Sequence, residues 1–101
     1  MKVREVIALK QVAEDLEEGR LFYDRKGAGI GSYFFDSLIS DIESLMLYAG
    51  IHSKQYALYR MLSKRFPFAI YYEIREDIVI VVAVLDMRRE PAWIRGKLEE
   101  R

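Results

Sequence analysis

Residues 78–85 read Ile-Val-Ile-Val-Val-Ala-Val-Leu, an apolar run with no polar interruption. Successive side chains of a strand point to opposite faces of a sheet, so such a run is typical of a strand that is covered on both faces. We therefore expect Ile78 to Met87 to form the central strand, and the rest of the fold to be arranged around it.

Two further β-like segments precede this strand. They extend from Tyr56 to Arg65 and from Phe68 to Arg75, and each is rich in aromatic and branched residues. Phe66-Pro67 separates the first segment from the second, and Glu76-Asp77 separates the second from the third. Three strands with such short connections predict an antiparallel meander.

Apolar residues at helical spacing indicate two helices upstream of the meander. The first extends from about Gln11 to Asp24, and the second begins near Ser32, a residue suited to N-capping, and ends before Gly50. The stretch Lys26–Ser32 contains three glycines, but no strand leads into it and it lacks a Gly-Lys-Ser/Thr ending. It is interpreted as the turn of a helical hairpin.

The two ends of the chain complete the prediction. A short first strand ends near Leu9, and a terminal helix covers Ala92 to Glu100, with Pro91 in its first turn. The expected fold is a single α+β domain over residues 1–101, in the order β-α-α-β-β-β. A helical hairpin packs on the antiparallel meander, and a short C-terminal helix follows.

Composition limits the classes of function. The chain has no cysteine, which excludes disulfides and thiolate zinc sites, and no apolar run long enough for a signal peptide or a membrane helix, so we expect a cytoplasmic protein without membrane partners. Sixteen basic and sixteen acidic residues cancel, which argues against a general nucleic-acid binder. Residues 1–50 hold six Lys/Arg against nine Asp/Glu (net −3), whereas residues 51–101 hold ten against seven (net +3). A local basic surface is therefore expected in the second half.

The cations of that half form a candidate site. They are Arg60, Lys64, Arg65, Arg88 and Arg89, and all lie in or beside the predicted meander. Arg60 and Lys64 have the same parity and point the same way, while Arg88 joins them or not according to register. The functional interpretation is a surface that binds phosphate and stabilises its charge. The alternative is a solvated edge with ion pairs to Glu73, Asp86 or Glu90.

Other candidate residues favour structural roles. The aromatic residues Tyr56, Tyr59, Phe66, Phe68, Tyr71 and Tyr72 could stack on bases, but aromatic residues in strands more often pack in the core. His52, the sole histidine, lies in a loop without a second histidine or a cysteine, so it is interpreted as an ordinary loop residue. Asp36, Asp41 and Glu43 are assigned to the solvated side of the second helix. No cofactor or metal is expected.

Two stretches resemble a known family. Arg65–Glu73 reads RFPFAIYYE and Val82–Pro91 reads VAVLDMRREP. Together they resemble the paired RFPYxIxY and RRDP signatures of the RelE/ParE superfamily, which comprises toxins of type II toxin–antitoxin systems, plasmid stabilisation proteins among them. Upstream, Glu14–Leu16, Phe22-Tyr23 and Gly29–Phe34 look like the first two helices of that family.

This resemblance implies a toxin that a cognate antitoxin holds inactive. It also implies one of two actions. Some members are ribosome-dependent, metal-independent endoribonucleases that cleave messenger RNA with clustered basic residues and a tyrosine or histidine near the carboxyl terminus. Others lack those residues and poison DNA gyrase. Carried onto this chain, the matching positions are Arg60, Lys64 and Arg88, as phosphate or transition-state contacts.

The chain departs from the family pattern where a general base is expected. Asp86 stands where many relatives have histidine before the arginine pair, and no tyrosine follows Tyr72. Three hypotheses therefore stay open: a messenger RNA endoribonuclease, a non-enzymatic inhibitor of gyrase, and a toxin fold that has lost toxicity and only binds its antitoxin.

Overall fold

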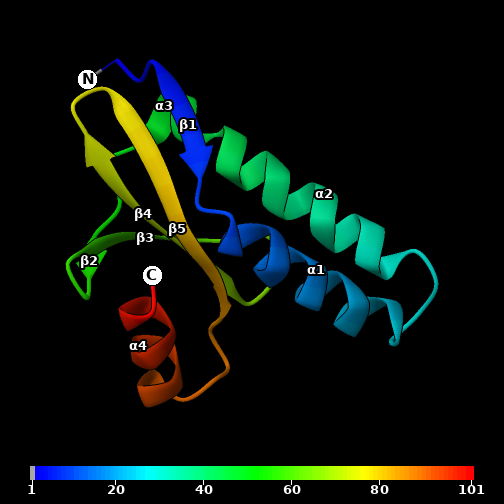
Figure 1. The fold of residues 1–101 in the computed structure, drawn as a ribbon. Coiled ribbons are helices and arrows are strands. Elements are labelled where there is room, and N and C mark those ends of the chain that lie inside the picture. Colours follow the sequence, from blue (N-terminus) through cyan, green and yellow to red (C-terminus); the bar gives the residue numbers. More distant parts are fainter. Residues whose placement is uncertain (1) are drawn as a thin grey trace.

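The computed structural model describes residues 2–101 and is built around β5 (Ile78–Asp86) (Figure 1). The other elements are β1 (Glu5–Ala8), α1 (Gln11–Asp24), α2 (Ile30–Glu43), α3 (Leu45–Tyr48), β2 (Lys54–Gln55), β3 (Leu58–Leu62), β4 (Phe68–Arg75) and α4 (Pro91–Glu99). The strands form one sheet in the order β1-β5-β4-β3-β2. The predicted α+β class, the helical hairpin and the C-terminal helix are confirmed.

The sheet is mixed, whereas the sequence predicted only an antiparallel meander. The meander exists: β2, β3, β4 and β5 pair antiparallel in turn. β1 then lies parallel to the free side of β5, with Val6 opposite Val79. This pairing removes the open edge that the most apolar strand would otherwise present to solvent.

Both faces of β5 are buried, as its composition predicts. Val79, Val81 and Val84 face a core that α1 and α2 cover, together with Leu16, Phe34, Leu38 and Tyr72. Val82, Ala83 and Leu85 face a second core with Tyr71 and with Ile94 of α4. Figure 1 shows the α1–α2 hairpin on one side of the sheet and α4 on the other. The short α4 is therefore a cover for the second face.

Two predicted boundaries were wrong. The second helix begins at Ile30 because Gly29, with φ of 85°, adopts the left-handed conformation that starts the helix, two residues before Ser32. The segment from Tyr56 to Arg65 is not one strand, because Tyr56 and Ala57 have φ of 59° and 66° and form a tight turn between β2 and β3. β3 ends at Leu62, so Lys64 lies beyond the strand.

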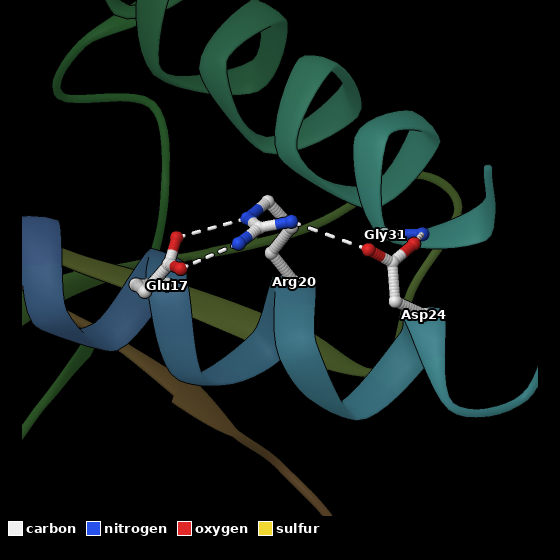
Figure 2. Close-up of polar contacts among 4 residues, drawn as sticks. All are labelled: Glu17, Arg20, Asp24 and Gly31. Atoms are coloured by element: carbon white, nitrogen blue, oxygen red, sulfur yellow. Dashed lines mark hydrogen bonds and ion pairs between the residues drawn. The ribbon is translucent and has the colours of Figure 1, made fainter. Parts of the chain in front are cut away.

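Charged side chains join the two long helices (Figure 2). The guanidinium of Arg20 donates to Glu17 at 2.6 and 2.9 Å and to Asp24 at 3.2 Å, and Asp24 accepts the N–H of Gly31 at 2.9 Å. The end of α1 is thereby tied to the first turn of α2. Helix N-terminal N–H groups have no partner within the helix, so the Asp24 carboxylate also acts as a cap.

A buried ion pair links the end of the chain to the sheet. Arg101 binds Asp15 of α1 through two hydrogen bonds of 2.8 and 2.9 Å, and both side chains are less than a tenth exposed. Asp15 also accepts the N–H of Val84, and Arg101 donates to the carbonyl of Val82. Because every partner is satisfied, this pair fixes α1 and the segment after α4 on β5. Within residues 2–101, no helix has the length and apolar character needed to cross a bilayer.

Alanine is expected to have opposite effects at Gly19 in α1 and at Gly96 in α4. At Gly19 an added Cβ would overlap the ring of Phe34, whereas at Gly96 it meets nothing within 4 Å. We expect Gly19→Ala to lower the free energy of unfolding by about 1–3 kcal/mol through overpacking, and Gly96→Ala to raise it by about 1 kcal/mol through helix propensity. Urea denaturation measures both, and equal effects of the two substitutions would contradict this packing of α1 on α2.

Candidate functional site

A hollow of about 400 Å³ opens beside β3, and we call it the β3 hollow. It is lined by His52, Ser53, Arg60, Met61, Leu62 and Lys64. Two of these residues are basic and none is acidic. Arg60 and Lys64 both line the hollow, although the shared strand face predicted for them was wrong because β3 ends at Leu62. His52, which the sequence assigned to an ordinary loop, lines it as well.

The β2–β3 turn creates this hollow. Its two-residue turn folds the segment before β2 back onto β3, and the N–H of Arg60 donates to the carbonyl of Ser53 at 3.0 Å. His52 precedes Arg60 by eight positions in the sequence, and the turn brings both residues to the lining of the same hollow. A tight turn with left-handed Tyr56 and Ala57 lacks the usual Asn-Gly signal, so the sequence did not reveal it.

The hydroxyl of Tyr72 orients His52. Tyr72 is fully buried, and its hydroxyl accepts the N–H of Gly50 at 3.0 Å and contacts Nδ1 of His52 at 2.5 Å. This contact fixes the ring of His52 with Nδ1 toward the protein interior. Every buried polar side-chain atom of residues 2–101 has a partner and Nε2 forms no hydrogen bond there, so Nε2 is open to solvent.

The surroundings keep His52 neutral. Burial lowers the pKa of His52 below its ordinary value, because the charged imidazolium loses solvation. Burial also raises the pKa of Tyr72, although the N–H of Gly50 opposes that rise, so the phenol stays protonated. The pair thus places an uncharged imidazole at the hollow.

Tyr71 lies beside Arg60, its partner in the β3–β4 register, on the face of the sheet opposite to Tyr72. Its side chain is buried and its hydroxyl lies 3.8 Å from the sulfur of Met87. Burial raises the pKa of Tyr71, and the nearby guanidinium of Arg60 opposes the rise. The predicted packing role of the aromatic residues is confirmed for both tyrosines, which lie in the two cores.

Asp41 supports the loop that carries Lys64. The sequence placed Asp41 on the solvated side of the second helix, and this was wrong, because Asp41 is only 5% exposed. Its carboxylate accepts the hydroxyl of Ser63 at 2.8 Å and the backbone N–H of Lys64 at 3.4 Å. These bonds position the backbone from which the Lys64 side chain extends.

Arg88 does not line the β3 hollow. Asp86 accepts its backbone N–H and two bonds from its guanidinium, at 2.8 to 3.0 Å. Burial opposes the charge of Asp86, but these bonds and the charges of Arg88 and Arg89 outweigh it and lower the pKa of Asp86. The Arg88 guanidinium lies 5.5 Å from the ring centre of Phe22 in α1, on the hairpin side of the sheet. Arg60 instead lies beside Tyr71, and Tyr71 belongs to the core on the other side.

The remaining cations of the predicted cluster are also dispersed. Arg65 lies over the ring of Tyr33 and Arg89 lies 4.0 Å from the ring centre of Trp93. A second hollow of about 340 Å³ lies between α1, the end of β5 and α4. Its charged lining is balanced, with Arg25, Arg89 and Lys97 against Asp15, Glu18 and Asp86. The lining of the β3 hollow is thus net positive, whereas the lining of this second hollow is neutral.

Comparison with known proteins supports the fold. No protein-family model matches the chain, and no curated protein matches its sequence. Its structure is similar to a solved chain of the chromosomal ParDE TA system from P. aeruginosa, with a TM-score of 0.71 at 14% identity, over 79% of this chain and 91% of that one. The resemblance to RelE/ParE toxins, stated from the sequence, is confirmed at the level of the fold.

The Tyr72 hydroxyl predicts how the only histidine titrates. We expect His52 to have a pKa below 6.5 with its neutral proton on Nε2, and Tyr72→Phe to raise that pKa, because Nδ1 no longer accepts a buried proton. Nuclear magnetic resonance of the single imidazole measures both quantities. A pKa at or above 6.5 in the unaltered chain, or a neutral proton on Nδ1, would contradict this arrangement.

The lowered pKa of His52 also makes the stability of the fold depend on pH. As pH falls, the imidazole is protonated in the unfolded chain before it is protonated in the folded chain. The contribution of His52 to the free energy of unfolding is therefore fully present above about pH 6.5 and is lost as pH falls through the folded-state pKa. His52→Gln removes this part of the pH dependence.

Proposed function

We propose that this chain is the toxin of a type II toxin–antitoxin pair, acting in the cytoplasm and held inactive by a cognate antitoxin. The observation that carries the proposal is the combination of fold and signature. The fold is similar to a chain of a ParDE system, and the two stretches that resemble the family signatures form β4 and β5, the centre of that fold. Either observation alone would support only the architecture.

An exposed apolar patch supports the proposed partner. Residues 46–51 include Met46, Leu47, Tyr48 and Ile51, and Leu47 and Ile51 are 80% and 73% exposed. Neighbouring apolar side chains of this size at a surface are typical of a region that another protein covers. The patch therefore fits a chain that is stored in complex with an antitoxin.

We further propose that the toxin acts by binding its target rather than by cleaving RNA, with DNA gyrase as the target. Ribonucleolysis needs a base to remove the proton of a ribose 2′-hydroxyl. In the β3 hollow, Nδ1 of His52 faces Tyr72, and no carboxylate residue is in the lining. Arg88, the third predicted contact, is bound by Asp86 outside the hollow.

Growth measurements test the toxin proposal. Induction of the chain alone is expected to arrest growth, and co-expression of the reading frame beside its gene is expected to restore growth and to yield a complex on purification. Unimpaired growth at an expression level where the folded chain is detected would contradict toxicity. Retained binding to the neighbouring product would then indicate a fold that has lost its toxicity.

Two assays on arrested cells and purified chain separate the actions. We expect inhibition of gyrase supercoiling and no new transcript ends within translated regions, because no general base is in place. Arg60→Ala is expected to weaken the effect by about tenfold if Arg60 contacts a charged group of the target. Transcript cleavage with unchanged gyrase activity would favour the endoribonuclease hypothesis and overturn the binding mechanism.

A further inference from the structure

We propose that the hollow between α1, the end of β5 and α4 is a binding site for a free adenine nucleotide, with the base bound to the open backbone edge of β5. This hollow has a volume of about 340 Å³, and we call it the β5-edge hollow. The inference goes beyond the proposed function and does not depend on it.

The edge of β5 is left open where β1 ends. β1 pairs with β5 only as far as Val81, and within residues 2–101 no other strand pairs with this side of β5. Beyond that point, the carbonyl of Val82 accepts a hydrogen bond from Arg101. The N–H of Val84 donates to Asp15. Two side chains thus replace a neighbouring strand for two backbone groups, and the last part of the edge stays open.

A carbonyl and an N–H face the hollow from this edge. In an antiparallel pair, the N–H and C=O of one residue point to the same side, and residues two positions apart point alike. Because the N–H of Val84 points away from β4, the carbonyl of Val84 and the N–H of Asp86 do so too. Met87 has the other parity and donates to Pro67 on the β4 side. Val84 and Asp86 both line the β5-edge hollow, which therefore contains one backbone acceptor and one backbone donor.

These two backbone groups match the edge of adenine. The Watson–Crick edge of adenine carries one donor, the 6-amino group, and one acceptor, N1, and proteins read bases through such edges. The corresponding edges of guanine, cytosine and uracil each carry three polar groups, so one of the three would be buried without a partner. An unpaired buried polar group weakens binding. The open edge of β5 therefore favours adenine among the nucleobases.

Flat side chains are available for both faces of a base in that position. A base bound to a strand edge lies in the plane of the sheet. Phe22 lines the hollow from α1 on the hairpin side, and Trp93 lines it from α4 on the side of the second core. The guanidinium of Arg89 lies 4.0 Å from the ring centre of Trp93, and bases stack on arginine planes as they do on aromatic rings. Phe68 and Leu85 add apolar surface to a hollow whose volume is typical of ligand pockets.

The charges of the lining suit a ribose and a phosphate. Its formal charge is neutral, but two of the three acidic lining residues, Asp15 and Asp86, already form ion pairs with arginines outside the lining. The third, Glu18, forms no ion pair within residues 2–101 and is suited to accept hydrogen bonds from ribose hydroxyls. Arg25 and Lys97 supply positive charge for the phosphate.

Fluorescence of Trp93, the only tryptophan of the chain, tests the proposal without any substitution. Titration with adenosine monophosphate should quench this fluorescence saturably, because the base stacks at the wall that Trp93 forms. Three analogues test the hydrogen bonds to the edge. The 1-deaza analogue lacks the acceptor N1, purine riboside monophosphate lacks the 6-amino donor, and guanosine monophosphate carries a third polar group. Each should bind about tenfold more weakly.

Calorimetry on two variants tests the phosphate contact. Arg25→Ala should weaken the binding of adenosine monophosphate by about tenfold and that of adenosine by less than about twofold, a difference that a merely structural residue would not produce. Arg95→Ala is the matched control, because Arg95 is an exposed arginine of α4 outside the lining of the hollow. It should change neither affinity by more than about twofold.

Four outcomes would overturn the proposal. They are an absence of saturable quenching, equal affinity for adenosine monophosphate and its 1-deaza analogue, an equal loss of affinity in Arg95→Ala, and tighter binding of a single-stranded oligoadenylate than of the free nucleotide. The last outcome would assign the hollow to a nucleic-acid strand. Growth arrest enters none of these measurements, so their failure would leave the toxin proposal standing.

Discussion

Two adjacent buried tyrosines impose the constraint on which the site depends. Tyr71 and Tyr72 lie in the middle of β4, and because successive residues of a strand face opposite ways, one enters each core. A buried phenol needs a hydrogen-bond partner. Tyr72 finds Gly50 and His52, and Tyr71 finds Met87 with Arg60 beside it. The two hydroxyls thus lie beside two polar side chains on opposite faces of the sheet, His52 at Tyr72 and Arg60 at Tyr71.

The same constraint determines what the site can do. The hydroxyl of Tyr72 contacts Nδ1 of His52, so Nε2 is the ring nitrogen that is open to solvent. Arg60 and Lys64 give the lining of the hollow its positive charge. Asp41 accepts the backbone N–H of Lys64 but is not itself a lining residue. Asp86 meanwhile binds Arg88 on the hairpin side of the sheet. The result is a hollow with basic residues and no acidic residue in its lining.

The sequence predicted what periodicity and composition control. The apolar run of residues 78–85 identified the central strand, and helical spacing identified α1 and most of α2. It missed what long-range geometry controls. The β2–β3 turn uses Tyr56 and Ala57 in a conformation that favours glycine or asparagine, so no local signal announced it. Without that turn, His52 could not be placed beside Arg60, and the separation of Arg88 depends on packing against Phe22 that no spacing reveals.

The central proposal is that the chain is a toxin that acts by binding its target and not by cleaving RNA. A supercoiling assay with purified gyrase and the purified chain measures this most directly. The account predicts that supercoiling is inhibited, and that transcripts stay intact in cells that express the chain. Unchanged supercoiling together with new transcript ends within translated regions would contradict it.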